Sequence, residues 1–600
     1  MSATKNNFKR ILVTIGIIVL LNIAGHFVFH RFDLTADKRY TLSQTSLNIV
    51  GKVKEPLYID VFLEGDFPGE FKKLQTETQQ LLEEFKSQNS NIIFRFINPL
   101  SDNEEDNETK REIIYSLFKL ENKVKDSIQE KEIKTSIKKV ENLNDAVKNQ
   151  FIGNLMMPVS VTLSDKGKQT QALVLPWAIA TCGNRSVKVP LLKNMMGAST
   201  SEKVVSSVQH LEYAFTNAIN SVTQKTQKKV IIIQGNGVLQ DKYIADFIKS
   251  VKDNYFIAPF PLDSISRNPT AGLKYLKKYD LAIIAKPTKA FSDEQKQVLD
   301  QYVINGGKTI WLVDQVNMEI DSLYNETGTN LAFPRDLNLN DMFFKYGFRI
   351  RPDLIKDLLA TPIVLETGEP GSGTQKVQLP WHFSPMIYPA KDTKNPIVSN
   401  LDAIKFQFAS PIELLKNKIK KTVLLQSSQY SKLIGTPAEI SLRMASEELG
   451  PKDFVGTGNY PVSVLLEGRF HSVYENRVIP FKDATFKNTG KDSKMIVISD
   501  GDVVKNQLDK NGREVELGLD QRTGILYANK EFMMNCVNYL LDDNGLINIR
   551  SKEVNLPILD KEKVYASYTY SQVITVVVPI LILLLFGVVF TVLRKRKYSK

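Results

Sequence analysis

The sequence has little of what catalytic and redox sites need. It contains 2 cysteines and 5 histidines in 600 residues. Cys182 and Cys536 lie far apart in the chain, so we expect two buried free thiols, with a disulfide in an oxidising compartment as the alternative. A G-x-S-x-G nucleophile elbow is also absent. We therefore predict a non-enzymatic protein with no catalytic residues, no metal and no cofactor.

The histidines offer no evident catalytic base. His26 lies inside an apolar segment, and His30 lies just beyond it. His210 lies beside the apolar stripe of a predicted helix, so we expect it at the surface. His382 follows Trp381 in a glycine- and proline-rich stretch, where packing a loop is the favoured interpretation.

A concentrated basic face is lacking too. The formal net charge is +12, but eight basic residues and no acid lie in two short tails outside the apolar segments: Lys5, Lys9, Arg10, Arg594, Lys595, Arg596, Lys597 and Lys600. Nucleic-acid binding needs a basic surface that displaces counterions, so we expect no nucleic-acid partner. The basic pI instead indicates membrane topology.

Two long apolar runs are present, at residues 11–29 and 573–593. Each approaches or reaches the roughly 20 residues that span a bilayer as a helix. Positive flanks place tails 1–10 and 594–600 in the cytoplasm. The first run is long for a signal peptide, lacks a following A-x-A site and has no lipid-attachment cysteine nearby. We expect two retained transmembrane helices and a large domain on the non-cytoplasmic side.

The first part of that domain alternates strand and helix. After a membrane-proximal segment at 30–55, in which Ser43 is a predicted N-cap, come a strand at 57–63, a helix at 71–86 and a strand at 91–97. A hairpin follows at 158–175. This order predicts a thioredoxin-like α/β subdomain over 56–195. Its first turn reads EGDFPGE where a C-x-x-C pair would lie, so we expect it to be redox-inactive, with a cis Met157–Pro158 bond.

The second part predicts a doubly wound α/β domain over 200–550. A helix at 202–222 shows apolar residues at spacings of three and four. Continuous apolar strands separated by amphipathic helices follow, as a parallel sheet covered on both faces requires. The expected elements are strands at 229–234, 255–260, 280–285, 309–313, 422–426, 462–466 and 495–498, and helices at 242–252, 293–304 and 525–541. We predict an insertion near 366–390 and a return linker at 551–572.

Several stretches together resemble one family. They are RFDLTADKRYTLS at 31–43, HLEYAFTNAIN at 210–220, YDLAIIAKPTKAFSDEQKQVLDQYVINGGKTIWLVD at 279–314, VSVLLEGRFHSVYENR at 462–477 and MIVISDGDVVKNQ at 495–507. The chain resembles the gliding-motility-associated ABC transporter accessory proteins called GldG, among ABC-transporter auxiliary ectodomains. The resemblance implies a bacterial inner-membrane subunit with a periplasmic domain, acting with a separate ABC permease and a cytoplasmic ATPase. It implies no catalytic residues.

The residues most suited to bind a ligand follow predicted strands. They are Gly235, Asn236 and Gly237 after one strand, Asp314 after another, and Asp500 with Asp502 after a third. Open α/β sheets place ligands at this edge, and paired carboxylates could hold Mg²⁺ or Ca²⁺. Helix capping and tight turns are the favoured alternative. The α/β domain is reminiscent of glutaminase-like and flavodoxin-like folds, but no cysteine nucleophile follows its strand at 280–285.

Polar residues within the first apolar run point to a docking surface. Asn22 and His26 are four apart, so they share a helical face that should contact protein. We favour an accessory subunit that couples its partner's ATP hydrolysis to work outside the membrane. An envelope hydrolase or amidase, or a solute-binding receptor, is the alternative.

Overall fold

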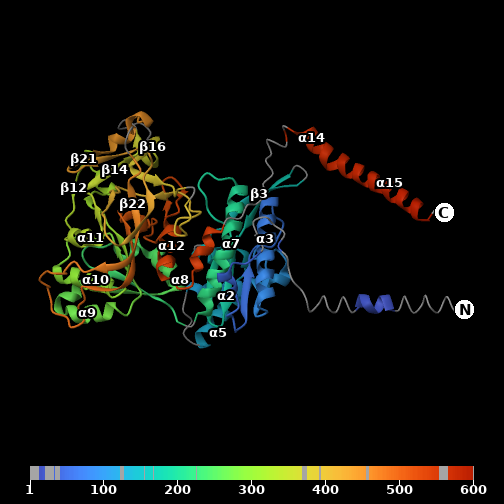
Figure 1. Ribbon diagram of the computed structural model, residues 1–600, viewed down its shortest axis with the longest axis horizontal. Helices are drawn as coiled ribbons and strands as arrows, with labels where there is room; N and C mark the ends of the chain where they lie inside the picture. The colour runs from blue at the N-terminus through green and yellow to red at the C-terminus, as the bar shows by residue number, and fades with distance from the viewer. Residues whose placement is uncertain are drawn as a thin grey trace. The chain divides into compact units, whose positions relative to one another are not determined.

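The structure is a computed structural model that describes residues 13–19, 33, 41–121, 127–154, 156–165, 168–224, 226–367, 375–390, 393–454, 458–552, 565 and 567–598. The chain forms two compact units, residues 1–552 and residues 553–600. The first unit is a mixed α/β structure. It contains an N-terminal α/β subdomain and a larger α/β subdomain (Figure 1).

The N-terminal subdomain is built on a four-stranded sheet of order β2-β1-β5-β6. Strands β1 and β2 are parallel and β5 is antiparallel to β1. The predicted strand–helix–strand unit is confirmed. The elements are α2 (Gln44–Val50), β1 (Leu57–Val61), α3 (Gly69–Gln88), β2 (Ile92–Phe96), β5 (Trp177–Cys182) and β6 (Arg185–Pro190). Ser43 caps α2, as predicted, by accepting a hydrogen bond from the backbone N–H of Ser46.

Between β2 and β5 lie three helices and a separate hairpin: α4 (Asn107–Glu121), α5 (Ser127–Lys138), α6 (Leu143–Gly153), β3 (Val159–Asp165) and β4 (Lys168–Val174). The predicted hairpin is confirmed, but it pairs only with itself. The strands that extend the central sheet are β5 and β6, which our prediction missed. The Met157–Pro158 prediction was wrong, because Thr436–Pro437 is the one cis bond in the described part of the chain.

Helix α7 (Thr200–Thr223) confirms the predicted helix and begins with a capping box formed by Ser199 and Glu202. About three turns later, the Glu212 carboxylate binds three polar groups. Its Oε1 accepts the Ser43 N–H and the Ser46 hydroxyl, both at 2.7 Å. Its Oε2 lies 2.7 Å from Lys552 Nζ, which also donates to the Thr41 carbonyl at 2.8 Å. One buried carboxylate thus joins the segment that precedes and begins α2 to Lys552, near the end of this unit.

The larger subdomain contains a seven-stranded sheet of order β19-β22-β23-β10-β9-β7-β8. Five neighbouring strands, β23 to β8, are parallel, whereas β22 and β19 add an antiparallel edge. The strands are β7 (Lys229–Gln234), β8 (Phe256–Pro261), β9 (Leu281–Ala285), β10 (Lys308–Leu312), β19 (Lys420–Gln426), β22 (Pro461–His471) and β23 (Thr489–Ile498). In chain order the parallel strands run 2-1-3-4-5, so their direction of winding reverses between β7 and β9.

Helices cover both faces of the parallel strands, as predicted. They are α8 (Ala245–Asn254), α9 (Pro269–Leu276), α10 (Asp293–Ile304), α11 (Asn340–Tyr346) and α12 (Asn529–Leu541). Helices α9 and α10 lie on one side and α8 and α12 on the other (Figure 1). Alternate residues of β9 divide between these cores, with Ile284 in one and Ile283 in the other. The last helix begins at Asn529, four residues later than predicted.

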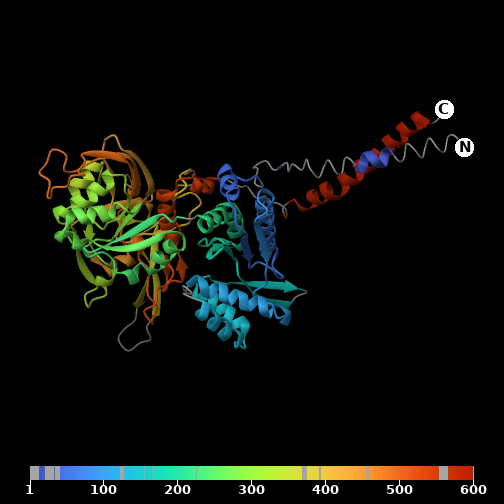
Figure 2. The ribbon, with the colours of Figure 1, turned by 90° about the horizontal axis from the view of Figure 1, so that it is seen from below.

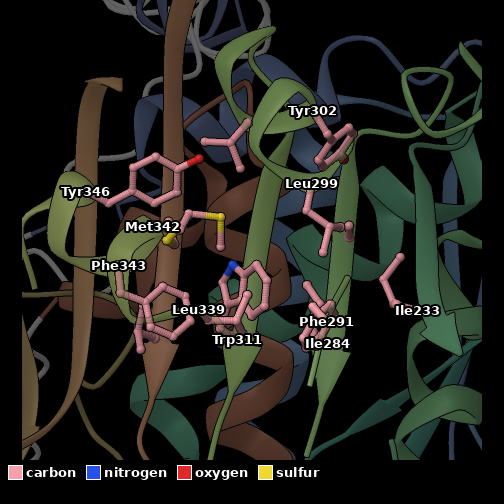
Figure 3. Packing of buried hydrophobic residues seen from close by; sticks show 14 of the residues in the cluster. Ile233, Ile284, Phe291, Leu299, Tyr302, Trp311, Leu339, Met342, Phe343 and Tyr346 are labelled. Carbon is pink, nitrogen blue, oxygen red and sulfur yellow. The ribbon is translucent and has the colours of Figure 1, made fainter. Parts of the chain in front are cut away.

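The core beneath α10 and α11 is rich in aromatic side chains. Trp311 of β10 is fully buried and lies at the centre of the close-up in Figure 3. Its ring contacts the Phe343 ring edge-on at 5.4 Å between centroids. Such pairs add about 0.5–1.5 kcal/mol to the burial of the rings themselves. This packing fixes β10 against the helices and so positions the chain that leaves its carboxyl end.

Small sheets fill the chain between β10 and β22. They are formed by β11 (Val316–Asn317), β12 (Thr329–Pro334) and β21 (Ala438–Ser441); β13 (Phe348–Ile350) and β18 (Ile412–Leu414); β14 (Asp353–Asp357) and β20 (Ser431–Gly435); and β15 (Ala360–Thr367), β16 (Gln375–Ile387) and β17 (Ile404–Lys405). The hairpin β15–β16 extends from the subdomain in the second view (Figure 2). The predicted insertion at 366–390 falls within this region, and residues 368–374 lie outside the described residues.

Nearly all of the described part of the second unit is one helical segment. Helix α14 (Tyr568–Gln572), a π-helical turn at Val573–Val577 and α15 (Val578–Tyr598) form one continuous helix of 31 residues. Within the described residues this is the one helix long and apolar enough to cross a membrane. Residues 13–19 are helical, but the rest of the first predicted span, including Asn22 and His26, lies outside the described residues.

Candidate functional site

The carboxyl ends of three parallel strands bring charged side chains to one edge of the sheet. Lys286 follows β9 directly, Asp314 lies two residues beyond β10, and Asp500 and Asp502 lie just beyond β23. Because these strands are neighbours, their carboxyl ends meet at the same edge. The structure thus brings together the three aspartates that the sequence singles out and adds a lysine that it does not.

Lys286 is the centre of this cluster. Its side chain is 3% exposed, and its Nζ lies 2.7 Å from Asp502 Oδ1, 2.8 Å from Glu319 Oε1 and 3.3 Å from Asp314 Oδ2. Although burial lowers the pKa of the ammonium, the three carboxylates outweigh it and raise the pKa well above its ordinary value. The lysine is therefore a fixed positive charge, held where a bound cation would otherwise be expected.

The backbone is shaped to hold this lysine. Lys286 has φ 55°, a left-handed conformation that few residues other than glycine adopt. A Cβ at Gly501 would lie 2.4 Å from the Lys286 side chain, so glycine is needed there. The Gly501 N–H donates to Asp314 Oδ1 at 2.5 Å. Strained backbone of this kind persists only where its surroundings determine it strongly, as the ion pairs do here.

The pKa values of two aspartates in this cluster are shifted in opposite directions. Burial, together with Asp502 and Asp314, raises the pKa of Asp500 well above its ordinary value. Burial also acts to raise the pKa of Asp502, but Lys286 and Lys505 outweigh it and lower that pKa. Asp500 also accepts backbone hydrogen bonds from Gln407 at 2.5 Å and Asp502 at 2.7 Å. The cluster thus combines ion pairs with backbone hydrogen bonds.

The predicted glycine loop lies at the reversal point between β7 and β9, where doubly wound sheets have their ligand crevice. Gly235, Asn236 and Gly237 all have left-handed φ values, of 99°, 49° and 67°. The Asn236 carbonyl accepts the backbone N–H groups of Thr288 and Lys289 at 3.0 and 2.9 Å. A Cβ at Gly237 would lie 2.0 Å from Thr288 Oγ1. The two loops are therefore bonded to each other across the crevice.

This arrangement offers little for metal binding or nucleophilic catalysis. Within the described part of the chain, no group of three or more histidine, cysteine or acidic side chains could hold a metal ion. Cys182 and Cys536 are buried free thiols, as predicted. His382 is buried, and its Nδ1 lies 2.8 Å from the Asp357 carbonyl. What the geometry provides is a rigid, ion-paired edge.

The surface prediction for His210 was wrong. This residue is half-buried, and its Nδ1 lies 3.2 Å from Arg550 Nη1. Burial, Arg550 and Lys193 together lower its pKa well below the ordinary value. Sequence reasoning missed this site because Arg550 is 340 residues away in the chain. The same distance hid Lys286, since a lysine directly after an apolar strand usually marks an exposed turn.

Comparison with known proteins identifies the class. The family model described as "ABC-type uncharacterized transport system", the auxiliary family of ABC transporters, matches residues 227–536. A domain of unknown function matches residues 36–181. The chain belongs to the ABC transporter auxiliary family, and its C-terminal apolar helix associates it with a membrane.

Two other comparisons cover curated proteins and solved structures. No curated protein matches the chain. Among solved structures, the chain is similar to one named "mmIFT52 N-terminal domain", with 13% identity and a TM-score of 0.28. That match covers 53% of this chain and 99% of the other. A score this low does not indicate a shared fold.

Proposed function

We propose that this chain is a non-enzymatic accessory subunit of an ABC-type transporter complex in the bacterial envelope, acting with a separate permease and a separate cytoplasmic ATPase. The family match over residues 227–536 is the observation that carries the proposal. The lysine-filled sheet edge supports it, because the usual ligand position of such a sheet is occupied by the chain's own charges. From the resemblance to gliding-motility proteins, we propose that this complex serves gliding motility.

We also assign fold types to the two subdomains. The β2-β1-β5-β6 order, with one antiparallel inner strand and a helix between β1 and β2, supports a thioredoxin-like fold without its thiol pair. The 2-1-3-4-5 order supports a doubly wound, flavodoxin-like fold. In this proposal both folds serve as scaffolds, and neither supplies chemistry.

Co-purification tests the proposed partners. The full chain, tagged and extracted from its native membrane, should recover a permease subunit and an ATPase subunit in fixed ratio. The Asp314→Asn variant separates scaffold from enzyme, because its Oδ1 can still accept the Gly501 N–H while the charge is removed. If the chain is a scaffold, the Asp314→Asn variant should recover the permease and the ATPase in the same amounts as the unaltered chain. A hydrolase that uses Asp314 would instead lose its activity with folding intact, and recovery of no transporter subunit by the unaltered chain would refute the proposal.

We further propose that residues 11–29 form a retained span, that both termini are cytoplasmic and that the large domain is periplasmic. Basic residues flank both apolar runs on their outer ends and support this topology. Cysteines introduced at Ser2 and Ser599 should resist a labelling reagent applied from the periplasmic side. Efficient labelling at either position would break the topology.

The first span is the proposed docking surface for the permease. Asn22→Leu combined with His26→Leu should abolish recovery of the transporter subunits while the chain stays folded and inserted. Thr591→Leu is the matched control in the second span, because Thr591 already donates to the Gly587 carbonyl of its own helix at 2.7 Å. Equal recovery with both variants would move the docking surface to the periplasmic domain.

A further inference from the structure

A cavity of about 560 Å³ lies between the two subdomains of the first unit. One wall comes from the N-terminal part, including Trp177 of β5 and the face of α7 that carries His210 and Asn217. The other wall comes from α12 and the segment around Leu526 and Arg550. Its volume lies within the range of roughly 300–1,000 Å³ that small-molecule pockets occupy.

The cavity wall holds a buried charge network that crosses the subdomain boundary. Glu531 Oε1 lies 2.8 Å from Arg550 Nη2 and 3.3 Å from Lys193 Nζ. The side chains of Arg550 and Lys193 are 1% and 8% exposed. Arg550 also donates to the carbonyls of Pro396 and Ser399, both at 3.2 Å. These partners fix two cations in the wall, with one shared carboxylate between them.

His210 adds a donor to the same wall. Arg550 can only donate, so the 3.2 Å contact requires His210 Nδ1 to be the acceptor. The neutral ring then carries its proton on Nε2. The cavity therefore has a fixed N–H donor beside two fixed cations.

The lining as a whole carries an excess of positive charge. Five basic residues and three acidic residues line the cavity: Lys188, Lys193, Lys203, Lys530 and Arg550 against Asp253, Glu516 and Glu531. Lys188 and Lys530 are already paired with acids, at 3.5 Å to Asp253 and 3.6 Å to Glu516. Lys203 has no carboxylate within ion-pair distance in the part of the chain that the structure describes. Its ammonium group is therefore available to pair with an anionic group of a bound molecule.

Apolar and aromatic side chains line the cavity as well, together with uncharged polar ones such as Asn217. The apolar and aromatic side chains include Phe71, Val159, Trp177, Leu191, Ala214 and Met534. A hydrated ion alone would gain nothing from these side chains, whereas an uncharged apolar molecule would give Lys203 no anionic partner. A molecule that carries an anionic group and an apolar body matches both the basic and the apolar parts of the lining.

We propose that this interdomain cavity binds a small amphipathic anion, with a carboxylate or phosphate group held by Lys203, the His210 N–H and the two wall cations, and an apolar body packed near Trp177. The site is separate from the sheet edge and does not depend on the transporter partners. Because both subdomains line it, the occupant joins them. The chain would thus bind a solute in addition to any role as a scaffold.

Isothermal titration of the full chain in nonionic detergent tests the proposal, with a detergent-only titration subtracted. The probes are 1-naphthaleneacetate, its uncharged analogue 1-naphthaleneacetamide and 1-naphthyl phosphate. We expect the better of the two anions to bind about tenfold more tightly than the amide, which corresponds to about 1.4 kcal/mol. The ranking of the two anions identifies the preferred head group.

Two variants locate the site. Lys203→Glu should weaken the anions about tenfold and leave the amide unchanged, whereas Lys252→Glu on the exposed face of α8 makes the same charge change away from the cavity and should have no effect. Asn217→Phe fills the cavity from α7 and should abolish binding, with folding checked by thermal melting. Equal binding of anion and amide, equal effects of the two lysine variants, or no heat above the detergent blank would overturn the proposal.

Discussion

Two of the clusters of buried charged side chains lie around Lys286 at the sheet edge and around Arg550 in the cavity wall. At the sheet edge, three carboxylates surround one lysine and the adjoining loops are bonded together. In the cavity wall, one carboxylate lies between two cations and 560 Å³ of space remains beside them. The first arrangement ties three strand ends together, whereas the second lies beside open space.

This difference shows that position in a fold does not by itself define a binding site. The carboxyl edge of a doubly wound sheet is where ligands usually bind, yet here the chain's own ammonium occupies it. The cavity is formed by two subdomains meeting, and neither subdomain would have it alone. Better guides to a binding site are whether open space remains and whether the polar groups beside it have partners.

The largest expected effect comes from breaking the sheet-edge cluster. Lys286→Met should lower the free energy of unfolding by about 3–5 kcal/mol, because it leaves buried carboxylates without their cation. Chemical denaturation of the full chain in detergent measures this loss. Lys289→Met, three residues away and exposed, is the control. Equal stability of the two variants would mean that the carboxylates are free to take a ligand, and the contrast with the cavity would disappear.

A pH-dependent effect is expected in the cavity wall. Burial acts to raise the pKa of Glu531, but Lys193 and Arg550 outweigh it and lower the pKa from 4.5 to about 2. A carboxylate with a lowered folded-state pKa adds stability above pH 4.5 and loses it as the pH falls towards 2. Glu531→Gln should therefore be less stable at neutral pH, by an amount on the order of 3 kcal/mol, and the difference should close between those two pH values.

The exposed acid Glu448, changed to Gln, provides the control for this measurement. Its melting temperature should follow that of the unaltered chain from neutral to acidic pH. If the Glu531→Gln curve ran parallel to both, the charge network of the cavity wall would contribute nothing to folding. The Lys286 and Arg550 clusters would then differ in how much they stabilise the fold, as well as in the open space beside them.

The smallest expected effect concerns the crevice beside the sheet edge. Gly237→Ala should cost about 1–3 kcal/mol more than Gly512→Ala, because both positions have left-handed φ values but only the Cβ at position 237 meets another atom. Thermal melting of the two variants isolates the steric part. Equal losses would indicate that the 235–237 loop can move away from Thr288 and open the crevice.

Much of the fold followed from local pattern. The helix at α7 and the parallel strands were predictable because apolar spacing and strand length are local properties of the chain. The strands β5 and β6 were missed, although Gly183 and Asn184 between them are a hairpin-turn signal. Strand pairing is a long-range property. The prediction placed strands in the nearby hairpin at 158–175 and did not extend them to β5 and β6.

The residues of the candidate sites also divide into those that a local pattern predicts and those that it does not. The positions of the three aspartates were predictable because each lies within four residues of the end of its strand. Lys286 and Glu319 were not, since their roles depend on three strand ends meeting. The cavity could not be foreseen at all. Its wall joins His210 to Arg550, 340 residues later, and no local pattern encodes that contact.

The carboxylate of Glu212 has a mechanical consequence. It holds Ser43 and Lys552 to one point on α7, and Lys552 also reaches the carbonyl of Thr41. A force that pulls Ser43 and Lys552 apart therefore acts on the bonds that both residues make to this one carboxylate.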